Sequence, residues 1–468
     1  MALMTQTPLS LPPELSPLLE HLRNAGIRPV LVGGYVRDAL LGRTGKDIDI
    51  ECYGAENLDT LASALKGFGT LNAVGKSFGV LKLKTGSLEI DLSLPRKETK
   101  TGTGHRGFSV ETFGEIDFET AARRRDFTVN AIGYDPFSEK LLDPFGGMKD
   151  LERKRLRCVD PATFVEDPLR LLRAVQFAAR FELVPDRRLL ALARKMTSAG
   201  ALDELPGERI FEEMKKLLLK AARPSVGFEV MDAMHITPFF PSLHALKQVP
   251  QEPASHPEGD VWTHTRLAVD AMAAERFGDE REKLICMLGI LCHDLGKPAT
   301  TRLFEGKITA PGHEDAGQAA ARRLLSRWTG DKKLFEAVLP LVRWHGLPKK
   351  LYKTRAPESE ILRLAVNVPV ERIVRIAKAD HFGRAGIENR PFKAGEWLTR
   401  KAKELGVLHR PLPPLILGRD LVAAGLSPSS TFSRILNDAY EAQLDGIFTT
   451  KETGAKWLKS YLEDLGKS

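Results

Sequence analysis

Apolar and polar residues alternate through the first third of the chain in a pattern typical of strands. Residues 30–32 are a short apolar run, and residues 47–50 read Asp-Ile-Asp-Ile. Residues 78–83 and 88–94 alternate on either side of a Thr-Gly-Ser turn. Since successive side chains of a strand point to opposite faces, we predict strands at these places, the last two forming a hairpin. Short helices are expected at 35–41 and 58–65.

From residue 150 the pattern changes to the period of a helix. In residues 164–181 apolar side chains recur at the spacing of one helix face, and further helices are expected at 261–274 and 284–292. Residues 240–258 are proline-rich and have no period, so we predict a linker and a domain boundary there. The chain after residue 390 again has a helical pattern, with a break at 411–414.

Length and composition narrow the class of protein. A chain of 468 residues is too long for one core, so two to four domains are expected. No apolar run approaches 18 residues and no signal-peptide pattern is present, so we expect no membrane span and no membrane partner. The net charge of +8 is compatible with a polyanionic partner. The scattered cysteines indicate a reducing cytoplasm rather than a zinc knuckle or a disulfide framework; they are Cys52, Cys158, Cys286 and Cys292.

The first candidate chemistry lies where a Gly-Gly turn precedes the Asp-Ile-Asp-Ile strand. Gly33 and Gly34 allow a phosphate to approach the backbone closely. Asp47 and Asp49 share one strand face, where their carboxylates repel each other unless a cation such as Mg²⁺ lies between them. Asp91, on the second strand of the expected hairpin, is a candidate third carboxylate. Taken singly, each feature could also be an ordinary turn or a solvated strand face.

The order of these residues is more specific than either feature alone. Gly-Gly-x-Val-Arg-Asp followed by Lys-Asp-x-Asp resembles the signature of the tRNA nucleotidyltransferase and bacterial poly(A) polymerase family, within the polymerase-β-like nucleotidyltransferases. Residues 121–135 contain three arginines and then Asp-Phe-Thr-x-Asn-Ala, which is similar to a second family motif. The resemblance implies that the nucleotide site includes Gly33, Gly34, Arg37, Arg125, Asp126 and Asn130. Residues 96–107 are polar and glycine-rich, and we expect a loop beside this site.

A third motif, Glu-Asp-Pro-x-Arg-x-x-Arg, begins at Glu166. Asp167 and Arg170 are three residues apart on the predicted helix, where an ion pair at the helix start is the simplest interpretation. The motif also resembles the family's Glu-Asp-x-x-Arg, which implies that its charged residues present donors and acceptors to the incoming base: Glu166, Asp167, Arg170 and Arg173. Residues 207–213 resemble the next family segment, and a salt bridge within one helix, Arg209 to Glu213, explains it without a catalytic role.

Histidines become frequent in the second half of the chain. A single His-Asp pair is usually a helix end, but a series of six residues in order resembles the HD superfamily of metal-dependent phosphohydrolases. Mixed nitrogen and oxygen ligands suit Mn²⁺, Ni²⁺, Fe²⁺ or Mg²⁺. One metal is described by His264, His293, Asp294 and Asp380, and the addition of His313 and His345 allows a second metal. The six residues are His264, His293, Asp294, His313, His345 and Asp380.

Together these resemblances imply a multidomain protein with a mixed α/β polymerase-β-like head and an all-α remainder. We expect a nucleotidyltransferase head at 1–150, a helical neck at 151–245, an HD domain at 255–388 and a helical tRNA-contacting tail at 390–468. The implied activity is CCA addition: transfer of CMP and AMP from CTP and ATP to the tRNA 3′ end with two Mg²⁺ ions, together with an HD phosphodiesterase or phosphatase activity.

Three alternatives stay open from the sequence. A poly(A) polymerase would share the head, although the short tail of mixed charge disfavours it. An enzyme that adds only A or only CC would share every motif. A catalytically inactive RNA-binding or nucleotide-sensing protein is the alternative from another class, and the intact Asp47 and Asp49 argue against it. The sequence leaves the oligomeric state open.

Overall fold

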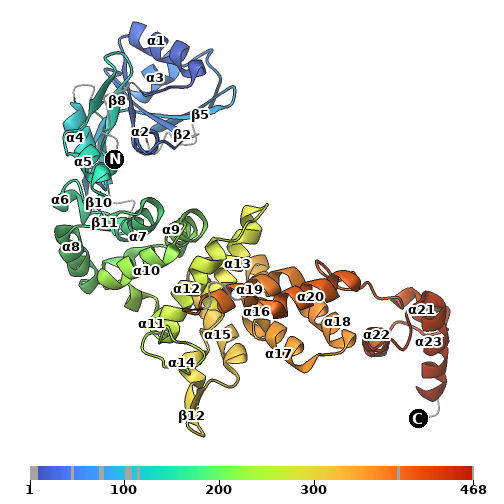
Figure 1. Ribbon diagram of the computed structural model, residues 1–468. Helices are drawn as coiled ribbons and strands as arrows, with labels where there is room; N and C mark the ends of the chain where they lie inside the picture. Colours follow the sequence, from blue (N-terminus) through green and yellow to red (C-terminus); the bar gives the residue numbers. More distant parts are fainter. Residues whose placement is uncertain are drawn as a thin grey trace. The chain divides into compact units, whose positions relative to one another are not determined.

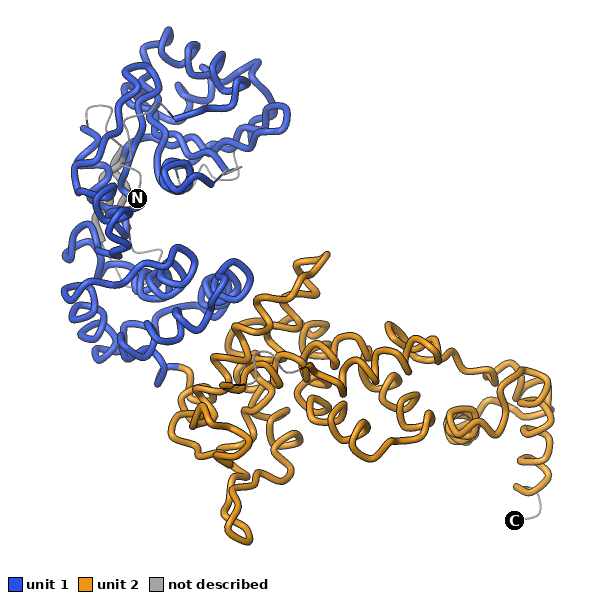
Figure 2. Tube along the Cα trace, viewed as in Figure 1, with its two compact units in different colours: residues 1–239 blue, residues 240–468 orange. Residues whose placement is uncertain are grey.

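In the computed structural model the chain forms two compact units, residues 1–239 and 240–468 (Figure 2). The structure describes residues 9–43, 47–72, 79–100, 108–112, 116–386 and 391–465.

The first unit begins with a mixed sheet (Figure 1). Within the described residues the sheet has seven strands in the order β3-β4-β5-β2-β1-β8-β9. Strands β2 and β5 run parallel, and the other neighbours are antiparallel. This confirms the predicted mixed α/β head. The strands are β1 Arg28–Val32, β2 Asp47–Tyr53, β3 Thr70–Asn72, β4 Val80–Thr85, β5 Leu88–Ser93, β8 Gly133–Asp135 and β9 Lys140–Leu142.

The alternation seen in the sequence decides which face of β2 and β5 is buried. Ile48, Ile50, Ile90 and Leu92 are fully buried, whereas the intervening acidic residues lie on the other face. The hairpin expected around residues 85–87 is confirmed by the pairing of β4 with β5, and Phe78 lies outside the described residues. Helices accompany the sheet at α1 Ser16–Asn24, α2 Gly34–Leu40, α3 Leu58–Ala64 and α4 Phe118–Arg123.

The prediction of a loop over the whole of 96–107 was wrong. Residues Arg96–Lys100 form β6, which pairs antiparallel with β7, Phe108–Thr112. A strand pair is held by backbone hydrogen bonds, so a polar stretch can form one without an apolar period in its sequence. Residues 101–107 lie outside the described part of the chain.

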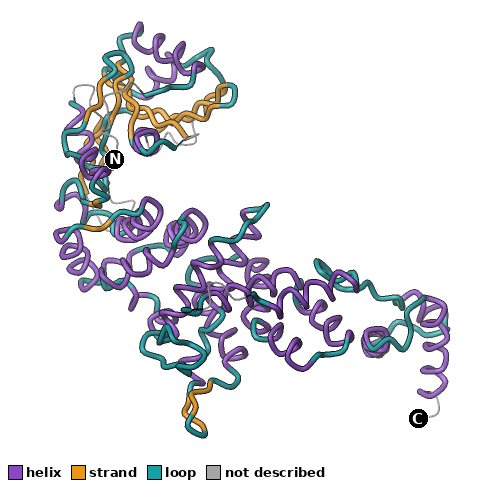
Figure 3. The backbone as a smooth tube through the Cα atoms, viewed as in Figure 1, coloured by secondary structure: helices purple, strands orange, loops and turns teal. Residues whose placement is uncertain are grey.

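The rest of the first unit is mostly helical (Figure 3), with one short parallel strand pair, β10 Arg155–Leu156 and β11 Val184–Pro185. The helix expected over 164–181 is interrupted, because α6 ends at Phe164 and α7 begins at Leu169. Pro168 accounts for the break, since the residue before a proline disfavours helical backbone angles. The helices of this region are α5 Gly147–Glu152, α6 Pro161–Phe164, α7 Leu169–Phe181, α8 Arg187–Ser198, α9 Gly207–Lys220 and α10 Pro224–Ala233.

The second unit is almost entirely helical (Figure 3). One hairpin, β12 Arg302–Phe304 with β13 Lys307–Thr309, projects from it (Figure 1). Among the described residues, no helix has the length and apolar character needed to cross a membrane. The helices are α11 Pro241–His244, α12 Val261–Ala273, α13 Glu280–Cys292, α14 Lys297–Thr300, α15 His313–Ser326, α16 Lys332–Trp344, α17 Leu347–Thr354, α18 Glu358–Asn367, α19 Val370–Phe382, α20 Lys393–Glu404, α21 Gly418–Ala423, α22 Ser430–Leu444 and α23 Lys451–Leu465.

The proline-rich stretch at 240–258 is not a free linker. It contains the short helix α11 and a loop whose Glu258 side chain is hydrogen-bonded to His264 of α12. The prolines stop regular helices from forming, but they do not prevent the loop from packing against its neighbours. The stretch therefore belongs to the second unit.

Two candidate functional sites

The parallel pairing of β2 and β5 brings the acidic residues of the head together. Asp49 lies opposite Asp91 in the register, and Asp47 is two residues before Asp49 on the same strand face. The pKa of Asp49 is raised to about 6, chiefly by burial and then by the charges of Asp91 and Asp47, against the opposing effect of Arg125. Asp91 also forms an ion pair with Lys82 at 2.9 Å. A divalent cation would relieve this repulsion, so the donor set fits Mg²⁺.

Gly33 lies directly beside these carboxylates, between β1 and α2. Its φ of 68° and ψ of −128° favour glycine over residues with a side chain. A Cβ at this position would lie 3.2 Å from Arg125 Nη1 and 3.4 Å from Asp49 Oδ2. The absence of a side chain therefore leaves the space between the arginine and the aspartate accessible from the Gly-Gly turn.

Arg125 is held in place by a glutamate that sequence reasoning did not select. Glu51 is 1% exposed and accepts hydrogen bonds from Arg125 Nη2 at 2.7 Å, Arg124 Nη2 at 3.3 Å and the Tyr53 hydroxyl at 2.8 Å. Although burial opposes it, the two guanidinium groups lower the pKa of Glu51. The sequence could have identified Glu51, because the period of two in β2 places it on the same strand face as Asp49.

Four residues expected in the nucleotide site form one buried hydrogen-bonded chain. Arg37 Nη1 donates to Asn130 Oδ1 at 2.5 Å, and Asn130 Nδ2 donates to Asp126 Oδ1 at 2.9 Å. Arg173 completes the chain with an ion pair to Asp126 at 2.6 Å. The Arg37 guanidinium also stacks over the Phe181 ring at 4.2 Å. These contacts fix the orientation of Arg37 and Arg173.

Asp167 and Arg170 do not form the ion pair expected from their spacing. Arg170 donates instead to two backbone carbonyls, Thr163 O at 2.7 Å and Arg124 O at 2.6 Å. Asp167 accepts from the amide of Leu169 and forms an ion pair with Arg209 at 3.3 Å. The break at Pro168 is the reason, because it takes Asp167 out of helix α7.

The expected Arg209–Glu213 salt bridge within one helix is therefore not the contact that forms. Arg209 reaches Asp167 across to the start of α7, and Glu213 pairs with Lys216 at 2.7 Å. Glu166, the first residue of the motif, is half-buried just before α7. The tertiary structure thus places Arg209 in contact with Asp167, one of the residues predicted to recognise the base.

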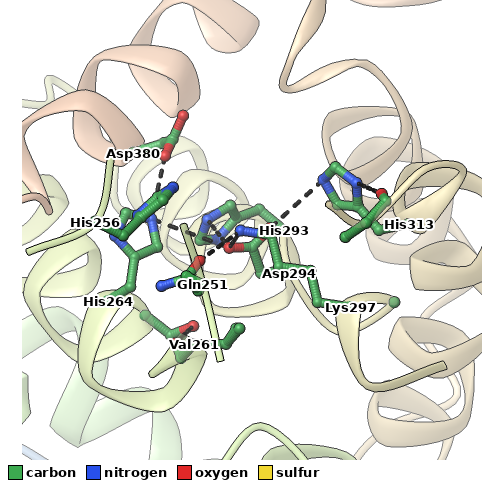
Figure 4. Close-up of polar contacts among 12 residues, drawn as sticks. Gln251, His256, Val261, His264, His293, Asp294, Lys297, His313 and Asp380 are labelled. Carbon is green, nitrogen blue, oxygen red and sulfur yellow. Dashed lines mark hydrogen bonds and ion pairs between the residues drawn. The ribbon is translucent and has the colours of Figure 1, made fainter. Parts of the chain in front are cut away.

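The second candidate site brings together all six residues predicted for the HD cluster, and Figure 4 labels them except His345. His264 comes from α12, His293 and Asp294 from the end of α13, and Asp380 from α19. His264 Nε2 lies 3.1 Å from Asp380 Oδ1, and His293 Nε2 lies 3.2 Å from Asp294 Oδ2. On the other side of Asp294, His313 Nε2 and His345 Nε2 lie 3.6 and 3.9 Å from its Oδ1.

The outer hydrogen bonds of the histidines decide which ring nitrogen faces the cluster. His293, His313 and His345 each hydrogen-bond from Nδ1 to the backbone carbonyl three residues earlier, over 2.6 to 2.8 Å. Since a carbonyl only accepts, these Nδ1 atoms carry the proton and the Nε2 atoms present lone pairs. His313 Nε2 and His345 Nε2 lie 3.2 Å apart, and buried His293 Nε2 has no hydrogen-bond partner in the described chain. Converging lone pairs suit a divalent metal ion.

Two further residues belong to this cluster and were missed in the sequence. Glu258 accepts from His264 Nδ1 and also contacts His256 Nδ1, both at 2.8 Å. These histidines lower the pKa of Glu258, against the effect of burial. The His-Pro-Glu sequence at 256–258 could have indicated these two residues, but it lies in a stretch that was interpreted as a linker. His256, Glu258 and His264 also bring ligand atoms within 4.8 Å of one another.

Lysines neutralise the two buried aspartates of the cluster. Lys297 Nζ lies 2.7 Å from Asp294 Oδ2, and Lys349 forms a short ion pair with Asp380. Although burial opposes it, neighbouring positive groups hold the pKa values of both carboxyls well below their usual range. Both aspartates are therefore ionised, as metal ligands must be.

Known family models match the parts of the chain that contain the two candidate sites. A "Poly A polymerase head domain" matches residues 30–157, a "Probable RNA and SrmB- binding site of polymerase A" matches 185–247, and an "HD domain" matches 261–383. The fold and the sites therefore define an enzyme of the nucleotidyltransferase class that carries an HD domain.

Curated relatives narrow the class further. The "Multifunctional CCA protein" of Halorhodospira halophila is 36% identical over 377 residues, covering 78% of this chain and 86% of that one. The protein of the same name from Nitrosococcus oceani is 34% identical over 429 residues, covering 90% and 99%. The chain belongs to this family, the tRNA nucleotidyltransferases called multifunctional CCA proteins.

Solved structures share the fold at lower sequence identity. The Bacillus stearothermophilus CCA-adding enzyme, solved in complex with CTP, is 20% identical and superposes with a TM-score of 0.67, covering 98% of this chain and all of that one. The Thermotoga maritima CCA-adding enzyme, complexed with tRNA, is 20% identical with a TM-score of 0.60, covering 97% and 96%. At this identity the likeness shows the fold alone.

Proposed function

We propose that the protein adds C and A to the 3′ end of tRNA, using CTP and ATP. The observation that carries the proposal is the position of Asp49 opposite Asp91, with Gly33 and Arg125 beside it. Two carboxylates on neighbouring strands can hold metal ions against a triphosphate, and the turn and the arginine can receive its phosphates. CTP and ATP complexes of CCA-adding enzymes with the same fold support this assignment.

The transfer is an in-line displacement at the α-phosphate. The 3′ oxygen of the tRNA attacks the α-phosphorus, the bond to the β-phosphate oxygen breaks, and pyrophosphate leaves. Two Mg²⁺ ions held by Asp47 and Asp49, with Asp91 beside them, would acidify the attacking hydroxyl and neutralise the leaving group. Arg125 donates to the triphosphate, and Glu51 keeps its guanidinium turned toward Gly33.

Base choice is assigned to Asp167 and Arg170. A carboxylate accepts from the exocyclic amino groups that cytosine and adenine present, and a guanidinium donates to a ring nitrogen or carbonyl. Arg209 restrains Asp167, and two backbone carbonyls restrain Arg170, so both groups have defined positions before a nucleotide arrives. The same pair then selects both bases without a nucleic-acid template.

The HD cluster is assigned a metal-dependent phosphodiesterase or phosphatase activity. The converging Nε2 atoms and ionised aspartates would hold Mn²⁺, Ni²⁺, Fe²⁺ or Mg²⁺. Such an ion activates water and polarises a phosphoester. We place the protein in the cytoplasm, where tRNA ends are processed, and its tRNA contacts on the segment 185–247 and the tail after 390.

One assay separates this function from the alternatives. The full-length protein is incubated with tRNA that lacks CCA and with labelled CTP, ATP or both. Addition of C, C and A in sequence is the expected result. Products that contain only A, only CC or long A tracts would identify the alternative enzymes, and no product would favour a binding or sensing protein.

A further inference from the structure

A small pocket adjoins the HD cluster and shares His313 with it. Its volume is about 280 Å³, and it lies between the loop at 250–256, the end of β13 and the residues just after α19. His313 and Lys297 line both the pocket and the cluster, so the pocket opens directly onto the candidate metal site. A volume at the lower end of ligand sites suits a phosphate group with the sugar that carries it.

The charge of this pocket is positive. Lys297 and Arg384 line it, and His256 lines it too, with its Nδ1 already hydrogen-bonded to Glu258. Glu252 is the acidic residue among the lining side chains, and it accepts a hydrogen bond from the backbone amide of Ile308 at 3.0 Å. An anion entering the pocket therefore meets the charge of Arg384 and the ammonium group of Lys297, whose charge is shared with Asp294, beside one carboxylate that is already hydrogen-bonded.

Two polar groups in the pocket wall lack partners. The Oγ1 atom of Thr301 and the Nε atom of Arg384 are buried and have no hydrogen-bond partner among the described residues. Buried polar groups are rarely left without a partner in folded proteins, and the exceptions often mark ligand sites. Arg384 also has no carboxylate partner in the described chain, although arginine is the side chain best suited to hold a phosphate by two hydrogen bonds.

The backbone around Arg384 is held firmly against the cluster. Glu258 Oε2 accepts from the amide of Ala385 at 3.3 Å, while the other oxygen of Glu258 binds His264. Gly383 approaches α12 so closely that a Cβ would lie 2.7 Å from the side chain of Ala268. Arg384 thus has a defined position, four residues after the cluster residue Asp380.

From this geometry we infer that Arg384, Thr301 and Lys297 form an anion-binding subsite, which holds a phosphoryl group of the substrate beside the HD metal cluster. The inference rests on the phosphohydrolase activity proposed above and adds the residues that would position the phosphoester. Arg384 supplies two parallel N–H donors, Thr301 supplies a hydroxyl, and Lys297 supplies a charge that is shared with Asp294.

The test uses the full-length, metal-loaded protein and inorganic phosphate as the probe. Isothermal titration calorimetry measures phosphate binding to the wild type and to Arg384→Gln, Thr301→Val and Arg302→Gln. We expect Arg384→Gln to weaken binding at least tenfold and Thr301→Val to weaken it several-fold. Arg302 is an exposed arginine on the adjacent strand β12 that does not line the pocket, so Arg302→Gln should bind as the wild type does.

Hydrolysis of 2′,3′-cyclic AMP separates this inference from the proposed activity. We expect Arg384→Gln to raise KM with unchanged metal content and unchanged nucleotide addition, and Arg384→Lys to restore part of the loss. Phosphate binding that depends on Arg384, in a wild type without hydrolysis, would support the subsite and overturn the phosphohydrolase. Wild-type hydrolysis with unchanged phosphate binding and unchanged KM in both Arg384→Gln and Thr301→Val would overturn the subsite.

Discussion

Glu51 and Arg125 form a buried ion pair in the head, with Glu51 Oε1 at 2.7 Å from Arg125 Nη2. The other side of the guanidinium lies beside Gly33 and Asp49, where the triphosphate is proposed to bind. The pair therefore joins a residue without a direct part in the proposed chemistry to one that is proposed to contact the triphosphate.

The first prediction concerns this ion pair. Glu51→Gln removes the charge that holds Arg125 but keeps the shape of the side chain, so KM for ATP should rise roughly tenfold with a smaller loss of kcat. Tyr53→Phe should have a weaker effect in the same direction. Glu119→Gln, which breaks the exposed pair with Arg123, is the matched control. Unchanged steady-state kinetics in folded Glu51→Gln would remove Glu51 from the site.

The second prediction concerns the metal-binding carboxylates. Asp49→Asn keeps the shape of the side chain but removes a proposed Mg²⁺ ligand, so nucleotide addition should fall by more than about a thousandfold. The exposed Glu56→Gln on the same unit should retain activity. Incorporation of labelled CMP into tRNA without CCA measures both variants, and substantial turnover by Asp49→Asn would refute the metal role.

The third prediction follows from the raised pKa of Asp49, which is about 6. A raised pKa means that the folded protein binds the proton more tightly than the unfolded chain. This contribution to stability is fully present below the ordinary value of 3.8 and is lost as pH rises through 6. Without Mg²⁺, Asp49→Asn should therefore melt at a higher temperature than the wild type at pH 8, with little difference near pH 4.

The measurement for this pH effect is thermal unfolding of both proteins with and without Mg²⁺. Mg²⁺ should raise the wild-type melting temperature at pH 8 and have less effect below pH 6, since protons compete for the same carboxylate. A wild type and an Asp49→Asn variant with parallel profiles across this range would contradict the assignment of the pKa to Asp49.

The fourth prediction concerns base choice. Asp167→Ala should allow misincorporation of U and G, because the acceptor for the exocyclic amino group is lost. Arg209→Gln should have a milder effect of the same kind, since it frees Asp167 without removing it. Arg170→Ala should reduce selectivity and also loosen the contacts to Thr163 and Arg124. Competition among the four labelled nucleotides measures selectivity, with Arg153→Ala, an exposed position just after α5, as the control.

The fifth prediction separates the two sites. His293→Ala combined with Asp294→Ala should remove bound transition metal while leaving nucleotide addition intact, because the two residues belong to the second unit. Elemental analysis of the purified protein measures the metal, and His409→Ala, an exposed histidine outside the cluster, is the control. An unchanged metal content in the double variant would show that the cluster is not the metal site.

The local pattern determined much of this protein. Alternation alone placed Asp47 and Asp49 on one face of a strand and predicted the β4–β5 hairpin, because the side-chain period of a strand is a property of its own backbone. The six HD residues could be selected from residue type and order. They come from five helices, and the structure brings them together.

Tertiary structure alone decided which side chains hold the candidate site residues in place. Glu51 meets Arg125 across 74 positions of the chain, Asp167 meets Arg209 across 42, and Arg384 lines a pocket with Lys297. The sequence favoured nearby partners instead, such as Asp167 with Arg170. A spacing of three or four predicts a contact only if one helix continues through both residues, and Pro168 breaks that helix. Contacts between distant segments depend on how the elements pack, which no local period encodes.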